Sequence, residues 1–426
     1  MTTDTTHPTD VIDTLLGEAI AAEVAPLRDL RPITRAEAQA SHDALFGADS
    51  PGASQLDKLL IAVFVTLLHG DEVAAEFCAN AVLALDAGSE KLQPIRQAAL
   101  GAATTGPYGD FPSAQLSSEN LDGPEYRAPE ELVVRVGRRL ASGLEYAHFL
   151  IFHPRDAHPE RISALLAAGW DENGVVTLAQ EVAFLAFQVR VVAGLAALAG
   201  QPRGFRQPVP VVRDSGTRLS SATPTDDPRA ATGERPTVFT SANLDWLSWV
   251  EPVAEADLTP AQITALVDAS RAKNPYFRLL ARDPGILEHR TKTDKDIFYN
   301  TATGIPRAER ELAATATSRF NGCLYCASVH SRFAEHYSKR GDEVALLLSQ
   351  GVQAITEPRW RAIIESAVAL SRTPIRFGLA QVASLRAIEF TDDDIADVVQ
   401  ASAFFNWANR LMLSLGEPAC PSPTDA

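Results

Sequence analysis

A proline-rich break between residues 200 and 238 divides this chain into two parts, and both parts carry the apolar spacing of helices. Prolines in the break alternate with Gly, Ser, Thr and Arg, with almost no periodic apolar content, which is typical of a linker. A length of 426 residues allows two or three domains, each with its own core, and two is the simplest count. We therefore predict a disordered tail (1–10), a helical domain (11–200), a Pro/Arg-rich linker (201–238), a second helical domain (239–417) and a tail (418–426).

Both domains are predicted to be all-α, because apolar residues recur at helical spacing and no series of short alternating segments would build a sheet. Before the linker, helices are predicted at 56–68, 71–85, 130–153, 159–168 and 177–199. After it, they are predicted at 259–272, 306–320, 323–340, 342–349, 357–370 and 392–415. Residues 101–129, rich in Gly, Pro and Ser, are predicted to be a disordered loop, with a lid as the alternative.

Charge and hydropathy argue against a nucleic-acid-binding, secreted or membrane protein. The formal net charge is −16, whereas a general binder of nucleic acids or anionic membranes needs clustered positive charge. The first ten residues lack the basic and apolar regions of a secretory signal. The apolar run 182–198 contains Gln188 and Arg190, which favours a buried core helix over a membrane span. We expect a cytoplasmic protein that binds neither nucleic acid nor membrane.

Four cysteines are too few for a disulfide scaffold in a chain of this length. In a reducing compartment, a Cys-x-x-Cys pair such as Cys323 and Cys326 is more often catalytic or metal-binding. Cys78 lies in an apolar segment typical of a buried thiol, and Cys420 lies in the Pro-rich tail. Thiol chemistry is therefore expected at Cys323 and Cys326.

The pair lies in the segment 321–330, which reads Asn-Gly-Cys-Leu-Tyr-Cys-Ala-Ser-Val-His. The Asn-Gly dipeptide predicts a turn, so a helix should begin at about Cys323, where the helix N-terminus favours a thiolate. Cys323, Cys326 and His330 then fall within about 60° of one another around the helix. His330, one turn beyond Cys326, can take the thiol proton directly or through a water. The segment predicts a redox site.

Two further side chains are candidates for this site. Glu311, on the preceding predicted helix, can orient the imidazole of His330 or relay its proton. The hydroxyl of Tyr325, between the two cysteines, can join the relay. Each residue alone is more often a surface or packing residue, and the combination is what indicates function.

A zinc site is an alternative, with His336 as the fourth ligand beside Cys323, Cys326 and His330. On one continuous helix, however, His336 points roughly 120° away from His330, so the four side chains cannot converge. We therefore predict that the site holds neither a metal nor a cofactor.

The two halves are also similar to each other in sequence. A constant offset of 182 places His148 opposite His330, and Ala141 and Leu144 opposite Cys323 and Cys326. Such a pattern indicates an internal duplication. In this register the first half keeps a histidine and has no thiols, which predicts a structural or oligomerisation role, with His148 a core residue or part of a small-molecule pocket.

The second half resembles a known family at these residues. Glu311, followed after eleven residues by Cys-Leu-Tyr-Cys-Ala-Ser-Val-His, resembles the active-site signature of the alkylhydroperoxidase D family, within the carboxymuconolactone decarboxylase superfamily. The resemblance covers about residues 245–416, and the first half resembles a degenerate domain of the same type, as in two-domain peroxidase-related proteins. It implies two tandem all-α domains, assembly into homo-oligomers and thiol-dependent peroxidase activity.

The resemblance also implies a role for each site residue. In the family the second cysteine attacks the peroxide and the first resolves the sulfenic acid, so Cys326 would be the peroxidatic thiol and Cys323 the resolving one. Glu311 and His330 would form the proton relay. Some family members carry a histidine immediately before the second cysteine, where this chain has Tyr325. Decarboxylase members of the superfamily lack the cysteine pair.

Three functions follow as hypotheses. The leading one is a peroxidase that reduces organic hydroperoxides and is itself reduced by a thiol or dithiol donor, which can be a protein. The second is a thiol–disulfide oxidoreductase that exchanges electrons through the Cys-x-x-Cys pair. The third is a non-enzymatic helical module with a structural or metal-holding role.

Overall fold

The computed structural model of the chain describes residues 10–208, 226–230 and 233–421. Within these ranges the regular structure is almost entirely helical, which confirms the predicted fold class. The exception is an antiparallel ribbon of two short strands, β1 (Asp245–Ser248) and β2 (Gly416–Ala419). The other parts of the predicted tails and linker lie outside the described residues: 1–9, 209–225, 231–232 and 422–426.

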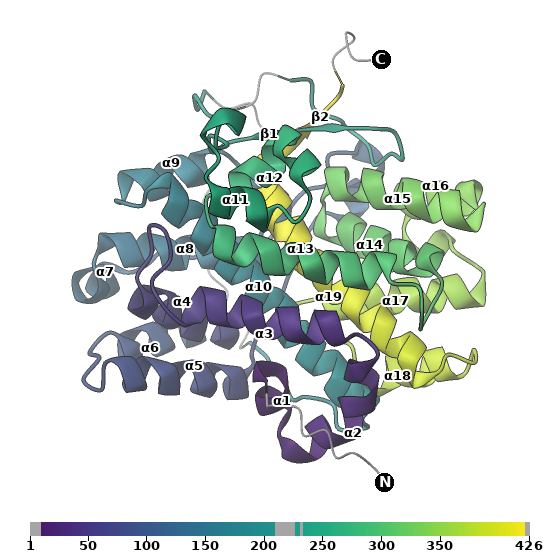
Figure 1. The fold of residues 1–426 in the computed structure, drawn as a ribbon, viewed down its shortest axis with the longest axis horizontal. Coiled ribbons are helices and arrows are strands. Elements are labelled where there is room, and N and C mark those ends of the chain that lie inside the picture. The colour runs from purple at the N-terminus through teal and green to yellow at the C-terminus, as the bar shows by residue number, and fades with distance from the viewer. Residues whose placement is uncertain (1–9, 209–225, 231–232, 422–426) are drawn as a thin grey trace.

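The helices of the first half are α1 (Val11–Leu16), α2 (Glu18–Asp29), α3 (Pro32–Phe46), α4 (Gln55–Leu68), α5 (Glu72–Leu85), α6 (Leu92–Ala102), η1 (Ala114–Glu119), α7 (Glu130–Val136), α8 (Arg138–Phe152), η2 (Pro154–Asp156), α9 (Glu160–Ala167) and α10 (Glu172–Leu198). Those of the second half are η3 (Glu255–Asp257), α11 (Pro260–Ala265), η4 (Ala269–Lys273), α12 (Pro275–Leu280), α13 (Pro284–Tyr299), α14 (Arg307–Asn321), α15 (Leu324–Ser338), α16 (Gly341–Gln350), η5 (Val352–Ala354), α17 (Pro358–Ser371), α18 (Leu379–Arg386) and α19 (Asp392–Ser414). In Figure 1 most first-half helices lie on one side and most second-half helices on the other, with α10 and α19 running through the middle.

Most helices predicted from apolar spacing are present, and the exceptions have local causes. Gly137 has a φ of 87° and divides the predicted helix 130–153 into α7 and α8, because this left-handed backbone interrupts helical bonding. The predicted helix 259–272 is likewise interrupted at Val267, with a φ of 65°, between α11 and η4. The helix α13 was not predicted because half of its buried side chains are polar. The other α-helices absent from the prediction are α1, α2, α3, α6, α12 and α18.

The prediction that residues 101–129 are disordered is wrong. The segment contains η1 and buries Tyr108, Phe111, Leu116 and Tyr126. Phe111 and Leu116 belong to a small apolar cluster with side chains of α15. The segment is thus packed against the helix that carries the cysteine pair, because its aromatic side chains supply apolar area that its Gly- and Pro-rich composition conceals.

The two halves repeat the same order of helices. The series α3, α4, α5 recurs as α13, α14, α15 with a shift of 252 positions, as from Pro32 to Pro284. The series α8, α9, α10 recurs as α17, α18, α19 with a shift of 220 positions, as from the N-cap Asp171 to the N-cap Thr391. The sequence prediction of two tandem helical units of similar type is therefore confirmed by the element order, while the predicted domain boundaries stay a prediction.

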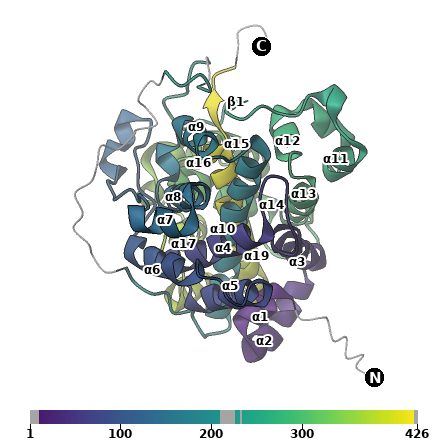
Figure 2. The same cartoon turned by 90° about the vertical axis from the view of Figure 1, so that its left-hand side faces the viewer.

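Equivalent helices of the two repeats pack against each other. The helix α10 packs along α19 and α3 packs along α13, as Figure 2 also shows for the edge formed by α3 and α13. At the α10–α19 contact, a Cβ added to Gly194 would lie 2.4 Å from a methyl group of Val399, so the glycine permits the close approach. One cluster of buried apolar side chains runs through both halves. The halves therefore pair in the manner of a two-fold dimer, within one chain.

Two buried arginines at equivalent positions hold this pairing. Arg190 of α10 donates to the carbonyl oxygen of Ser371 at the end of α17 (3.1 Å), and Arg410 of α19 donates to that of Ile151 near the end of α8 (3.5 Å). Each guanidinium thus satisfies a carbonyl in the last turn of a helix from the other half.

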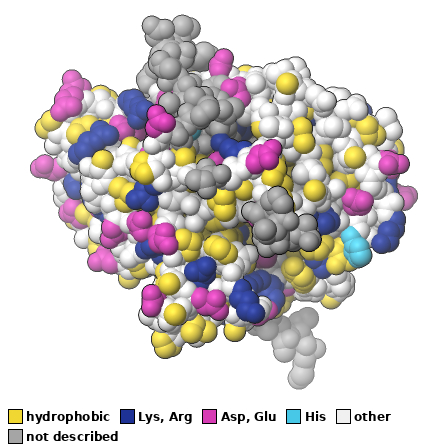
Figure 3. Space-filling model, turned by 90° about the horizontal axis from the view of Figure 1, so that it is seen from above, with side chains coloured by type: hydrophobic (Ala, Val, Ile, Leu, Met, Phe, Trp, Pro, Cys, Tyr) yellow, Lys and Arg dark blue, Asp and Glu magenta, His cyan; other side chains and the backbone are white. Residues whose placement is uncertain are grey.

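The helix α10 is, among the described residues, the one that is long and apolar enough to cross a membrane, but all of its apolar window is buried inside the protein. The prediction of a buried core helix at 182–198 is confirmed. On the face shown in Figure 3, Lys and Arg side chains are intermixed with Asp and Glu side chains.

Candidate active site

The turn between α14 and α15 positions the cysteine pair. Gly322 ends α14 in the left-handed conformation, with a φ of 84°. The backbone N–H of Gly322 donates to the carbonyl of Arg319 (3.1 Å) and that of Cys323 to the carbonyl of Ser318 (2.8 Å). Cys323 is then the N-cap of α15. The predicted turn at Asn321-Gly322 and the predicted helix start at Cys323 are both confirmed.

Both thiols are free and buried, with 2% of Cys323 and 5% of Cys326 exposed. Burial together with the hydrogen bond and charge of Cys326 raises the pKa of the Cys323 thiol well above its ordinary value. Burial also acts to raise the pKa of Cys326, but hydrogen bonds from Cys323 and Asn409 and the charges of His330 and Arg290 together lower it below the ordinary value. Cys326 is therefore the thiol that more readily becomes a thiolate nucleophile.

The imidazole beside Cys326 is held by a buried carboxylate. The Nδ1 atom of His330 lies 2.5 Å from Oε2 of Glu311, and Nε of Arg307 donates to the other carboxylate oxygen at 3.0 Å. Glu311 is 1% exposed. Since Nδ1 is occupied by Glu311, the second ring nitrogen of His330 is the one left for exchange with the thiol or a substrate.

Burial lowers the pKa of His330, but the charge and hydrogen bond of Glu311, with smaller contributions from Cys326 and Asp294, raise it above the ordinary value. The imidazolium is thereby stabilised relative to the neutral ring, next to a thiol whose pKa is lowered. A cationic His330 stabilises a Cys326 thiolate and carries a proton that it can give to a leaving oxygen.

Aromatic rings enclose the imidazole. The ring of Phe405 lies 4.1 Å from that of His330 between centroids, and the ring of Phe298 lies 5.6 Å away. Arg307, which anchors Glu311, is itself stacked on the rings of Tyr299 (4.2 Å) and Tyr337 (4.6 Å). The Glu311–His330 pair is therefore surrounded by aromatic side chains, and their low dielectric constant strengthens the electrostatic interaction between the two groups.

Tyr325 and His336 are the other two candidate residues from the sequence. Tyr325 is half-buried, and among the described residues no hydrogen bond joins its hydroxyl to Glu311 or His330, so its part in the relay stays a prediction. His336 is exposed and lines a surface hollow with Ser241 and Gly341. Across the described ranges, no group of three or more His, Cys, Asp or Glu side chains is arranged to hold a metal ion.

A buried group of amides behind the thiols was not predicted from the sequence. The Asn321 amide donates to the side-chain oxygen of Asn409 at 3.0 Å, and the Asn409 amide donates to the hydroxyl of Ser318 at 3.0 Å as well as toward Cys326. Asn406 and Asn409 lie on α19, one turn from each other, and are fully buried. Asparagines spaced along a long, otherwise apolar helix are the signal that could have pointed to them.

The first half also reaches the turn before Cys323. Arg155 donates to the carbonyl oxygen of Phe320 through Nε (3.1 Å) and Nη2 (2.6 Å), and its side chain covers Gly322. A cavity of about 330 Å³ beside this turn is lined by residues of both halves, including Arg155, Gly322 and Leu324. The first half therefore supports the backbone from which the thiols project.

Comparisons with known proteins bear on this segment. Residues 284–369, from the start of α13 into α17, match the model of the carboxymuconolactone decarboxylase family. This part of the chain is therefore similar to that family. The matched segment contains Glu311, Cys323, Cys326 and His330.

Two solved structures are also similar to the chain. One is an alkylhydroperoxidase AhpD core, an uncharacterised peroxidase-related protein from Ralstonia eutropha, with 26% identity over 37% of this chain and 83% of that chain and a TM-score of 0.32. The other is an uncharacterised peroxidase-related protein from a Silicibacter species, with 23% identity over 39% of this chain and 93% of that chain and a TM-score of 0.34. A comparison with curated proteins found no match.

The carboxymuconolactone decarboxylase segment has a counterpart in the first half, but not in the register that the sequence predicts. His148 lies on α8, whose counterpart is α17, so it is not equivalent to His330. The equivalent of the Gly322 turn is Gly70, with a φ of 78°, after which the N–H of Asp71 donates to Thr66 as that of Cys323 does to Ser318.

At the shift of 252 positions, none of the residues that correspond to the site residues is an activated thiol or part of a proton relay. Leu59 stands for Glu311, Asp71 for Cys323, Ala74 for Cys326 and Cys78 for His330. Burial, with the charges of Glu181 and Asp71, raises the pKa of the Cys78 thiol to about 12. The first half thus keeps the backbone of the site and lacks its chemistry, whereas the offset of 182 matched similar residues without matching the turn.

We expect the substitution Glu311→Gln in the carboxymuconolactone decarboxylase segment to shift the reactivity of Cys326 to higher pH. Glu311 raises the pKa of His330, so its neutral replacement lowers that pKa, leaves less imidazolium at neutral pH and raises the pKa of Cys326. Roughly tenfold slower alkylation at neutral pH is the expected size. The measurement is the rate of iodoacetamide labelling at Cys326 against pH, resolved by mass spectrometry.

The matched control is Glu309→Gln on the same helix. Glu309 forms an ion pair with Arg359 at 2.6 Å, away from the thiols, so its loss should leave the pH profile of Cys326 unchanged. Equal profiles for Glu311→Gln and the unchanged protein would contradict the coupling of Glu311 to the thiol.

Proposed function

We propose that the protein is a thiol-dependent peroxidase that reduces organic hydroperoxides through Cys326 and Cys323. The observation that carries the proposal is the pair of reduced, adjacent cysteines beside a histidine whose Nδ1 lies 2.5 Å from a buried carboxylate. The carboxymuconolactone decarboxylase family match over this segment and its similarity to peroxidase-related proteins agree with the proposal.

In the proposed reaction, the Cys326 thiolate attacks the terminal peroxide oxygen and the O–O bond breaks. The alcohol leaves with a proton from His330, and Cys326 becomes a sulfenic acid. The Cys323 thiol, which is within hydrogen-bonding reach of Cys326, then displaces water to form a disulfide. An external thiol or dithiol donor returns both cysteines to the thiol form.

The lowered pKa of Cys326 and the raised pKa of Cys323 suit these two roles. The attacking group should be a thiolate, and the resolving group should stay protonated until a sulfenic acid has formed. The hydrogen bond that Nδ1 of His330 donates to Glu311 keeps one proton on the ring nitrogen that does not face the substrate, and the imidazolium then supplies the other proton.

The test is peroxide treatment followed by mass mapping. One equivalent of tert-butyl hydroperoxide should produce a Cys323–Cys326 disulfide, seen as the loss of two hydrogens from the peptide that carries both thiols, and a dithiol should reverse it. Oxidation confined to Cys78 or Cys420, or none at the pair, would refute the assignment. A cysteine-to-serine change at Cys78 and Cys420 together gives the background for this measurement.

A thiol–disulfide oxidoreductase is the second candidate, since the same Cys-x-x-Cys pair can exchange electrons with another disulfide. The raised pKa of Cys323, the first cysteine of the motif, argues against it as the exposed nucleophile in such an exchange. Comparing the rates of Cys326 oxidation by tert-butyl hydroperoxide and by a small disulfide separates the two. Assembly into homo-oligomers and a cytoplasmic location remain expectations beside this proposal.

A further inference from the structure

A buried arginine near the thiols has neither a hydrogen-bond partner nor an ion-pair partner among the described residues. Arg290 of α13 is 6% exposed, and among the described residues no hydrogen bond or ion pair reaches its guanidinium group. Its Nε atom is fully buried without an acceptor. Its neighbours are the rings of Phe404 (5.2 Å) and Tyr276 (5.8 Å), which offer it only the faces of π systems.

A second orphaned donor lies beside it. The hydroxyl of Tyr276, on α12, is buried and meets no hydrogen-bond partner in the part of the chain that the structure describes. Its ring is packed edge-on against Trp246 (5.2 Å) and Phe277 (5.4 Å). Burying a hydroxyl without a partner is unfavourable, and burying a charge without one is more so, so the two groups together point to a site for a ligand that accepts hydrogen bonds.

Both groups lie next to the candidate active site. Arg290 contacts Phe404, which packs edge-on against Phe405 (5.8 Å), and Phe405 in turn packs on His330 (4.1 Å). The charge of Arg290 also acts on the Cys326 thiol, and Tyr276 is near enough to be influenced by both cysteines. The orphaned donors and the peroxidatic thiol therefore share one aromatic-walled region.

Neither resident anion accounts for the two donors. Asp294, one turn beyond Arg290 on α13, forms no ion pair with it in the described structure, and burial raises the pKa of its carboxyl. The Cys326 sulfur already receives hydrogen bonds from Cys323 and Asn409. A carboxylate offers two oxygens that can accept from the guanidinium fork and from the tyrosine hydroxyl together.

We propose that Arg290 and Tyr276 bind the carboxylate of an organic hydroperoxide, so that the peroxide group at the other end of the molecule is presented to Cys326. The inference rests on the proposed peroxidase function and names its substrate class. The rings of Phe404 and Trp246 pack against the two donors and offer apolar contact to the rest of such a molecule, and its carboxylate supplies the charge opposite to that of Arg290.

The experiment compares three hydroperoxides: γ-hydroperoxyisocaproate, its methyl ester, and tert-butyl hydroperoxide. The unchanged protein should show a higher kcat/KM for the acid than for the ester. Arg290→Met removes a charge that lowers the pKa of Cys326, so it should slow all three substrates to a common extent. It should lower kcat/KM for the acid by about a further 10- to 100-fold, the range expected for hydrogen bonds to a charged group. Tyr276→Phe should also lower kcat/KM for the acid more than for the neutral substrates, but by a smaller factor than Arg290→Met.

The control is Lys292→Met, which removes a positive charge from the same helix where it is exposed and paired with Glu288. It should leave all three rates unchanged. Equal losses for acid and neutral substrates in Arg290→Met, with a raised pH for Cys326 alkylation, would overturn the proposal in favour of a role on the thiol alone. No change for any substrate would also overturn it.

A binding measurement separates failure of this inference from failure of the proposed function. Calorimetry with isocaproate, which carries no peroxide, should give binding to the unchanged protein and to Lys292→Met, and none to Arg290→Met. Isocaproate binding without turnover of any hydroperoxide would refute the peroxidase and retain the carboxylate site. Turnover of tert-butyl hydroperoxide without isocaproate binding would support the peroxidase and refute the carboxylate site.

Discussion

Replacing Cys326 by serine is expected to reduce peroxide consumption to the uncatalysed background. The serine hydroxyl has nearly the same size and can keep the hydrogen bonds from Cys323 and Asn409, but it does not ionise in the range that His330 and Arg290 favour for the thiol. The measurement is the rate of tert-butyl hydroperoxide loss with a dithiol in excess, with the thermal unfolding curve as a check that the fold is retained.

Two other serine substitutions give this experiment its controls. Cys78→Ser changes a thiol whose pKa burial raises to about 12, and it should leave turnover unchanged. Cys323→Ser should still consume one equivalent of peroxide and then stop at a sulfenic acid or a higher oxidation state of Cys326, because no resolving thiol remains. Sustained turnover by Cys326→Ser would exclude Cys326 as the peroxidatic thiol.

Much of the candidate site could be predicted because its parts are close in sequence. Cys323, Cys326 and His330 follow one turn, and Glu311 lies on the helix immediately before it, so local geometry brings them together. Arg290, Tyr276 and Asn409 come from α13, α12 and α19, and nothing in local spacing indicates that these helices meet beside the thiols. Tertiary packing decides which distant polar residues join a site.

The contrast between local spacing and tertiary packing also explains which helices could be predicted from the sequence. Helices with a strongly apolar buried face, such as α4, were predicted from periodicity, whereas half of the buried side chains of α13 are polar, including arginine, threonine and aspartate. The duplication was detectable in sequence, but its register was not, because similar residues at an offset of 182 outweighed the turn at Gly70. A hydrogen-bonded turn is shared by the repeats even though the side chains that flank it differ.

The pairing of the repeats connects the first half to the proposed chemistry. The helix α19 supplies Asn409 and Phe405 to the site on one side and packs along α10 on the other. Arg155 of the first half binds the carbonyl oxygen of Phe320, just before the turn that carries the cysteines. The half that lacks the cysteine pair therefore completes the scaffold of the half that has it.

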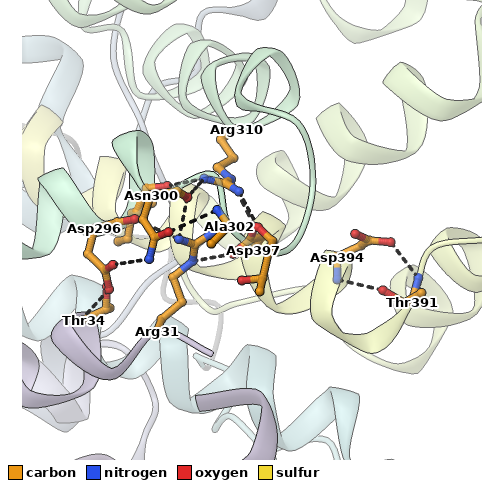
Figure 4. A network of polar contacts seen from close by, with 11 residues as sticks. Arg31, Thr34, Asp296, Asn300, Ala302, Arg310, Thr391, Asp394 and Asp397 are labelled. Atoms are coloured by element: carbon orange, nitrogen blue, oxygen red, sulfur yellow. Dashed lines mark hydrogen bonds and ion pairs between the residues drawn. The ribbon is translucent and has the colours of Figure 1, made fainter. Parts of the chain in front are cut away.

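The second large effect is expected at Asp397, where the two halves share a buried ion-pair network (Figure 4). Asp397 of α19 is paired with Arg31 of the first half at 2.9 Å and with Arg310 of α14 at 3.1 Å, and all three side chains are buried. Asp397→Asn leaves two buried guanidinium groups around a neutral amide. Breaking a buried pair in this way costs about 3–5 kcal/mol, to be measured as the loss in free energy of unfolding by urea.

The control lies one turn earlier on the same helix. Asp394 is half-buried and accepts a hydrogen bond from the backbone N–H of Thr391 at 2.9 Å in a capping box, as Figure 4 also shows. Asparagine can cap in the same way, so Asp394→Asn should change the free energy of unfolding by less than about 1 kcal/mol. Because Arg31 comes from the first half, a loss for Asp397→Asn no larger than that of the control would mean that this network does not bind the two halves together. The double substitution Arg31→Met with Asp397→Leu removes both members of one ion pair. It should destabilise the protein less than Asp397→Asn, because one buried guanidinium group, that of Arg310, loses its carboxylate partner instead of two. Arg310 also keeps its hydrogen bonds to the carbonyl oxygens of Ile297 (3.1 Å) and Thr303 (2.7 Å).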